Sequence, residues 1–157
     1  MGQLVDVRGK FHAAACRPGG VDRRGAMRSA EISLSDLRSS IEVAVRERLT
    51  PLIEALRAWD SADVAACCDW AAALRDLAGL AEMHLLTEVA MHCFDCHDLI
   101  AIDGASMSGA EAACYADALA FAAQGQCSGR DLTRYGPLLQ DLGTLTGRIA
   151  TRRVRQG

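Results

Sequence analysis

Apolar residues recur at steps of three and four after residue 33, which is the spacing of one face of an α-helix. The first run is made up of Leu34, Leu37, Ile41, Val45, Leu49, Leu52, Leu56 and Trp59. Ser35 is a suitable N-cap for this helix, and Asp36 falls in its first turn. The pattern therefore predicts an amphipathic helix from Ser35 to about residue 59, with a kink or a restart capped by Thr50 at the interior Pro51.

A second run of the same kind begins after the break at "WDSAD", with Asp60 or Ser61 as the expected cap. It keeps one phase through Val64, Cys67, Ala71, Leu74, Ala78, Ala81, Leu85, Val89, His92 and Cys96. Because a sharp turn would normally destroy this phase, we expect a single long helix over residues 61–101. The alternative is two helices, one ending at Gly79 and the next starting at Leu80, but a helical hairpin usually needs a loop of a few residues.

Two further helices are predicted after the loop "IDGASM". Ser108 followed three residues later by Glu111 is a capping box, and it predicts a helix from Gly109 to Gln124. After the break at "GQCSGRD", a last helix has Pro137 in its first turn. Its apolar face is formed by Leu138, Leu142, Leu145 and Ile149.

The two ends of the chain lack this periodicity. Residues 1–29 contain "RPGGVDRRG" and are predicted to be a disordered basic tail. Codons for Arg-Arg-Gly just before Met27 can spell a ribosome-binding site, so Met27 is a candidate natural start. Residues 152–157 are predicted to be a basic tail that frays. Residues 30–151 then form the folded part.

Together these elements predict an all-α, single-domain antiparallel bundle of four to five helices, with one long central helix and a disordered N-terminal tail. The 157 residues are enough for one core. Half of the residues are apolar, much of that share is alanine, and aromatic residues are 4% of the chain. Alanine favours helix but covers little area, so closely packed helices with a thin core are expected.

Charge is unevenly distributed along the chain. The total is −3, but residues 1–29 carry +4, residues 150–157 carry +3 and residues 30–149 carry −10. An acidic body argues against a general nucleic-acid partner, because phosphate contacts need a basic face. No apolar run approaches the ~18 residues of a membrane span, and no secretion signal is visible, so a cytoplasmic protein without a membrane partner is expected. One lysine among 17 basic residues suggests a GC-rich bacterial genome.

Seven cysteines, an odd number, are expected to be free thiols in a reducing compartment. The segment "HCFDCH", residues 92–97, is the densest candidate site. Cys93, Cys96 and His97 form the attachment pattern of haem c, in which two thiols three residues apart meet the vinyl groups and the adjacent histidine binds iron. That chemistry normally takes place outside the cytoplasm, which weighs against it here.

A zinc or other transition-metal site is a second interpretation of this segment. His92 and Cys96 are four residues apart, as are Cys93 and His97, so each pair can contact one ion from a helix. Two more ligands must then come from elsewhere, with Cys114 and Cys127 as candidates. A thiolate pair of Cys96 and His92 lacks an orienting third group, so no catalytic residue is predicted.

The third and favoured interpretation is structural. His92 and Cys96 continue the apolar stripe and are expected to be core residues, while Cys93 and His97 are expected near the edge of the helix. The sequence therefore predicts a non-enzymatic interaction or regulatory module that acts through protein–protein contacts. Self-association is expected, because an alanine-lined long helix gains from pairing with a copy of itself. The alternatives are a small metal or redox sensor using His92, Cys93, Cys96 and His97, and a haem c protein.

Overall fold

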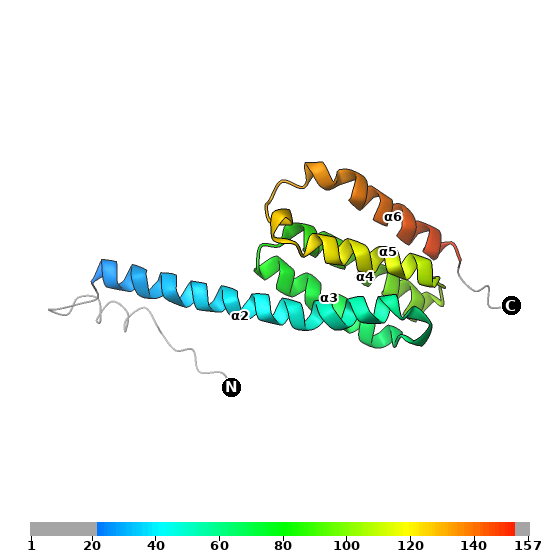
Figure 1. Cartoon of the computed structure of the whole chain (residues 1–157), viewed down its shortest axis with the longest axis horizontal. Helices are drawn as coiled ribbons and strands as arrows, with labels where there is room; N and C mark the ends of the chain where they lie inside the picture. The colour runs from blue at the N-terminus through cyan, green and yellow to red at the C-terminus, as the bar shows by residue number, and fades with distance from the viewer. Residues whose placement is uncertain (1–21, 153–157) are drawn as a thin grey trace, which may run out of the picture. The chain divides into compact units, whose positions relative to one another are not determined.

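The computed structural model describes residues 22–152, and this part of the chain is all-α (Figure 1). Its elements in order are α2 (Arg23–Arg57), the 3-10 turn η1 (Trp59–Ser61), α3 (Val64–Leu80), α4 (His84–Asp103), α5 (Gly109–Ala122), the 3-10 turns η2 (Gly125–Cys127) and η3 (Thr133–Tyr135), and α6 (Gly136–Ala150). Five helices and no strand among these residues confirm the predicted all-α bundle. None of these helices is long and apolar enough to cross a bilayer.

The chain divides into two units, Met1–Ser39 and Ser40–Gly157. In the described part of the first unit, residues 22–39, every residue is exposed and nearly all belong to α2. The second unit contains the rest of α2 and all of α3–α6. Its core combines buried residues from every helix, and the contribution of α2 is Val45, Leu49, Leu52 and Leu56.

Helix α4 is the central element of the second unit, because it packs against α3, α5 and α6 (Figure 1). Helix α5 also contacts α6 and the turn η1. The bundle therefore has a central helix, but it is α4 alone rather than the long helix predicted over residues 61–101, and it is covered on several sides. That arrangement determines which residues of "HCFDCH" are buried.

The first helix begins earlier than predicted. Asp22 caps α2, because its carboxylate accepts hydrogen bonds from the backbone N–H groups of Arg24 (3.2 Å) and Gly25 (3.0 Å). Ser35, the expected cap, lies inside the helix, so the predicted boundary of a disordered tail at residue 29 is wrong for residues 23–29. The rest of that tail, residues 1–21, lies outside the described residues. Pro51 also lies inside α2, which does not restart at Thr50.

The single helix predicted over residues 61–101 is wrong, because the chain turns between α3 and α4. Glu82 adopts a left-handed conformation with φ 57°, and the N–H of Met83 donates to the carbonyl of Ala78 (2.9 Å). This is a Schellman closure made without glycine, so the usual glycine signal for the end of a helix is missing at this position. Helices α3 and α4 pack against each other, and residues of the stripe on both helices, such as Leu74 and Leu85, are buried.

The starts of the later helices agree better with the sequence. Asp63, rather than Asp60 or Ser61, caps α3 through the N–H groups of Ala65 and Ala66. The capping box of Ser108 and Glu111 is present and starts α5 at Gly109, as predicted. Pro137 lies in the first turn of α6, also as predicted.

The C-terminal end of the described chain is held by an ion pair. Arg152 Nη1 donates to Glu111 Oε2 (2.7 Å), and Nη2 donates to the other carboxylate oxygen. The guanidinium of Arg152, together with the hydrogen bonds from Ser108, lowers the pKa of Glu111 to about 2. Arg152 therefore belongs to the bundle rather than to a fraying tail, while residues 153–157 lie outside the described residues.

Candidate functional site

The "HCFDCH" segment lies in the middle of α4. Cys93, Cys96 and His97 are completely buried, whereas His92 is only half-buried. His92 faces α6, where a Cβ atom at Gly143 would lie 3.7 Å from its imidazole Cε1 atom. The expectation that Cys96 is a core residue is confirmed.

The expectation that Cys93 and His97 lie at the edge of the helix is wrong, as is full burial of His92. The prediction from the apolar stripe took only one face of the helix to be buried. Because α4 contacts α3, α5 and α6, more than one of its faces is buried. The partners across several interfaces, rather than the position in the repeat, decide burial here.

His97 has one ring nitrogen bonded and one without a partner. Nδ1 lies 2.6 Å from the backbone carbonyl oxygen of Cys93, which requires the proton to be on Nδ1. Nε2 then presents a buried lone pair that receives no hydrogen bond. The ring stands edge-to-face to Trp59, with ring centroids 5.5 Å apart. Because burial penalises the imidazolium, the pKa of His97 is lowered, and the Cys93 carbonyl offsets this shift only in part.

The buried thiols are held in the protonated form. Burial raises the pKa of Cys96 to about 11 and raises the pKa of Cys93 well above its ordinary value. The Sγ atom of Cys96 lies 3.7 Å from Met107 Sδ. The thiolate is the reactive form of cysteine, so these two side chains are poor nucleophiles and poor ligands in this fold.

The geometry of the segment does not fit haem c or a metal ion. Cys93 and Cys96 have no exposed surface, and His97 already packs against Trp59, so no space remains for a porphyrin. Cys93 Sγ and His97 Nδ1 are 3.7 Å apart, but Nδ1 is engaged by the Cys93 carbonyl. Among residues 22–152, no three His, Cys, Asp or Glu side chains gather in a way that could hold a metal ion.

The expected additional ligands lie elsewhere. Cys114 is exposed on α5, and Cys127 donates its thiol proton to the carbonyl of Phe121 (3.3 Å). All six cysteines of the described chain are free, as predicted; Cys16 lies outside that chain.

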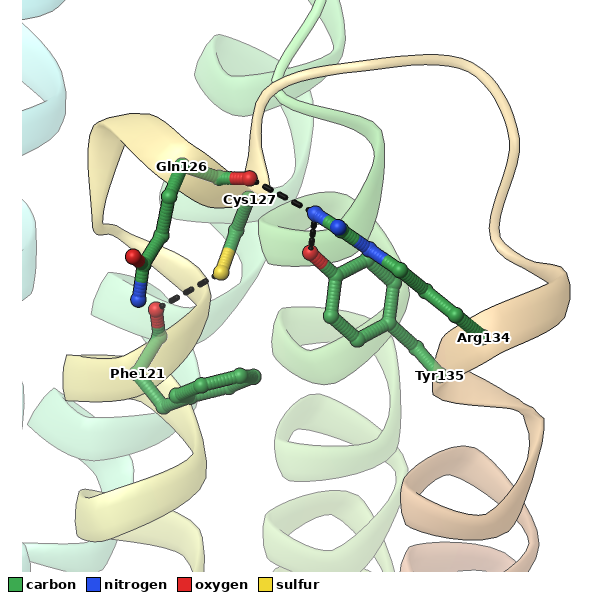
Figure 2. Close-up of a pocket in the computed structure, with 5 residues that line it drawn as sticks. All are labelled: Phe121, Gln126, Cys127, Arg134 and Tyr135. Carbon is green, nitrogen blue, oxygen red and sulfur yellow. Dashed lines mark hydrogen bonds between the residues drawn. The ribbon is translucent and has the colours of Figure 1, made fainter.

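A cavity of about 330 Å³ lies beside η2 and η3 (Figure 2). It is lined by Phe121, Gln126, Cys127, Arg134 and Tyr135. The guanidinium of Arg134 stacks over the ring of Tyr135 (4.6 Å to the centroid) and donates to the Gln126 carbonyl (2.7 Å) and to the Tyr135 hydroxyl. Figure 2 shows the guanidinium between these two acceptors. Arg134 thus joins η2 to η3 between α5 and α6, which is a structural role.

A second cavity, of about 410 Å³, lies between α5 and α6 and is mostly apolar. It is lined by Ala110, Glu111, Cys114, Leu138, Asp141, Leu142, Leu145 and Arg148. The carboxylate of Glu111 is already bound by Arg152 and Ser108. The cavity therefore offers apolar surface rather than a set of convergent polar groups.

The first turns of α2 carry the largest cluster of exposed apolar side chains close together in the described sequence. Met27, Leu34 and Leu37 are 55%, 66% and 57% exposed and share one face of the helix, and Ile32 is exposed on the other side of it. Met27 was not predicted to be part of a helix, because residues 1–29 were predicted to be a tail. The signal was present, since Met27, Leu34 and Ile41 are seven residues apart.

Comparison of the chain with models of known protein families, with curated proteins and with solved structures gives no match in any of the three.

Proposed function

We propose that this chain is a non-enzymatic interaction module that acts through protein–protein contacts made by the exposed face of α2. The observation that carries the proposal is the exposure of Met27, Leu34 and Leu37, each more than half accessible. Apolar side chains grouped on one surface are typical of interaction sites, whereas single exposed ones are ordinary.

The contrast with the rest of the chain supports this choice. In α3 and α4 the residues of the apolar stripe are nearly all buried, for example Leu74, Leu85 and Val89 with no exposed surface. A helix whose apolar face stays exposed gains little stability from its own sequence, because most helices depend on packing of that face. The exposed apolar positions at the start of α2 are therefore best explained by a partner.

The alternative of a metal or redox sensor at His92, Cys93, Cys96 and His97 has less support. The thiols of Cys93 and Cys96 are buried with raised pKa values, and sensor thiols need accessible thiolates. The same facts argue against catalysis by these residues, since a nucleophile must reach its substrate.

The proposal is tested by site-specific photo-crosslinking in the producing cell. Benzoylphenylalanine replaces Ser33, which is exposed on α2 beside Leu34 and Leu37, and the matched control places it at Gln140, which is exposed on α6. We expect a defined adduct from position 33 that disappears in Leu34→Asp. Mass spectrometry of the crosslinked peptide should then identify the partner protein, and the purified partner should bind the chain. Adducts that survive Leu34→Asp, or that form equally at position 140, would refute the proposal.

A further inference from the structure

The exposed part of α2 has the repeat of a coiled coil. With Met27 at position a of a heptad, Leu34 and Ile41 also fall at a. Ala30, Leu37 and Ala44 fall at d. The positions up to Leu37 are exposed, whereas Ile41 and Ala44 are half-buried and Ile41 packs against the core of the second unit. These positions form one seam on the helix, and a seam of this type buries itself against another helix with the same repeat.

The charges beside this seam are self-complementary. Position e is Glu31 in one heptad and Arg38 in the next, and the g positions are Ser33 and Ser40. In an antiparallel pair, a side chain at e faces an e position of the other helix, whereas in a parallel pair e faces g. A parallel pair would place Arg38 opposite a serine. An antiparallel pair of identical helices places Glu31 opposite Arg38 twice.

We infer that the partner of the exposed α2 face is a second copy of this chain, bound antiparallel about a two-fold axis that crosses α2 between Ser35 and Asp36. This inference rests on the proposed function and names its partner. Leu34 of each copy then packs against Leu37 of the other, and Glu31 of each copy faces Arg38 of the other. A two-fold axis satisfies both ion pairs with one sequence, as an isologous interface requires.

The antiparallel pairing places self-association on α2, not on the alanine-lined segment 61–101 for which it was predicted. The alanine-lined helix expected over residues 61–101 is a hairpin in which Ala71 and Ala78 are already buried, so those alanines have no surface left to pair. The overlap of α2 with its copy spans only two to three heptads. We therefore expect a dimer that dissociates on dilution rather than an obligate one.

The test is sedimentation velocity of the full chain over a concentration series, with circular dichroism confirming that each variant is folded. Leu34→Asp should weaken the dimer about a hundredfold or more, because it places two carboxylates, one from each copy, near the centre of the seam. Glu31→Arg and Arg38→Glu should each weaken the dimer about tenfold through like-charge contacts. The matched control Glu42→Arg changes an exposed charge at position b, off the seam, and should leave the dimer unchanged.

Mixing the two single charge variants distinguishes the orientation. The variant Glu31→Arg has arginine at both positions, and the variant Arg38→Glu has glutamate at both. The two variants can therefore pair with each other through two favourable contacts, so an equimolar mixture should recover the native dimer affinity. The double variant Glu31→Arg/Arg38→Glu should recover it as well. A mixture no stronger than either variant alone overturns the antiparallel pairing, and so does a dimer that survives Leu34→Asp.

A chain that stays monomeric at every concentration also overturns the inference. If position 33 nevertheless crosslinks to another protein that binds in purified form, the proposed function stands and only the identity of the partner was wrong. If position 33 gives no adduct that depends on Leu34, the proposed function fails too.

Discussion

The start of α2 and the α3–α4 hairpin follow the same rule of spacing and reach opposite outcomes. Leu34 and Leu37 recur on one face of α2 and remain exposed, whereas Leu74 and Leu85 recur on one face of the hairpin and are completely buried. A period of three and four residues thus defines an apolar face but not what covers it. In the hairpin the cover comes from the same chain, and we propose that in α2 it comes from another copy.

The difference also has a chemical side. The hairpin buries titratable groups, among them Cys67, Cys93, Cys96 and His97, and burial shifts their pKa values toward the neutral form. The exposed face of α2 consists of aliphatic residues with charged residues beside them. The thiols and the imidazole of the buried region are therefore neutral at pH 7, whereas the exposed face of α2 offers aliphatic surface.

The largest expected contrast is in thiol reactivity. Cys93 and Cys96 should react with iodoacetamide at least about a thousandfold more slowly than the exposed Cys114, because they must wait for the bundle to open. At a concentration low enough to prevent dimerisation, a cysteine introduced by Leu34→Cys should react about as fast as Cys114. Alkylation followed by peptide mass spectrometry measures all of these rates. Rapid reaction of Cys93 or Cys96 in the folded protein would restore the redox-sensor interpretation.

Replacing a leucine by alanine should lower the free energy of unfolding much more in the α3–α4 hairpin than at the start of α2. Leu74→Ala should lower the free energy of unfolding by about 3 kcal/mol, because it leaves a cavity in the core. Leu34→Ala should change the free energy of unfolding of the monomer by no more than about 0.5 kcal/mol. Urea unfolding at a concentration low enough to prevent dimerisation compares the two. Equal losses would mean that the start of α2 is covered within one chain.

Acid should destabilise the bundle through His97. Its pKa in the folded state lies below the ordinary value of 6.5, so below pH 6.5 the unfolded chain binds a proton that the folded chain does not. The stabilisation is therefore complete above pH 6.5 and is lost as pH falls toward the folded pKa, by up to about 1.4 kcal/mol per pH unit. Glu111, with its pKa of about 2, adds a loss only below about pH 4.5.

Urea unfolding at several pH values between 7 and 5 measures this dependence. His97→Leu should flatten the slope of stability against pH in that window, whatever its effect on stability at pH 7. An unchanged slope in His97→Leu would assign the dependence to another group.

The smallest expected effect concerns two serines that the sequence treats alike. Ser108→Ala should cost about 1 kcal/mol, because the side chain accepts a hydrogen bond from the N–H of Glu111 at the start of α5. Ser35→Ala should be neutral or stabilise by up to about 0.5 kcal/mol, because Ser35 is exposed inside α2, where alanine is the better helix former. Thermal unfolding of both variants compares them. A loss of about 1 kcal/mol in Ser35→Ala would mean that the helix starts at Ser35 after all.

The sequence predicted helix starts correctly where the stabilising contacts involve only neighbouring residues. The capping box of Ser108 and Glu111 and the proline at the start of α6 involve only neighbouring residues, and both were predicted correctly. The start of α2 was missed because Asp22, an equally good cap, lies between arginines and glycines that indicated a tail. A helix start in which the cap is followed by few regularly spaced apolar residues is easily mistaken for a loop.

The candidate site shows where local reasoning ends. The spacing of Cys93 and His97 correctly placed them one turn apart, and the hydrogen bond from His97 to the Cys93 carbonyl spans that turn. Their burial depends on α3, α5 and α6, which come from distant parts of the sequence. The sequence therefore contains the residue patterns of a haem c site and of a metal site. In the folded chain, however, the side chains of these patterns have no space for a porphyrin and no free donor atoms for a metal ion.

By itself, the sequence determined that this protein is helical, because the repeat of its apolar residues, its caps and its alanines act within a few residues along the chain. The tertiary structure decided that residues 61–101 form a hairpin, that three of the four side chains of the Cys/His segment are buried, and that the apolar face at the start of α2 is exposed. The physical reason is that burial is a property of pairs of surfaces: a periodic sequence specifies one surface, and only the folded chain, or a second copy of it, supplies the other.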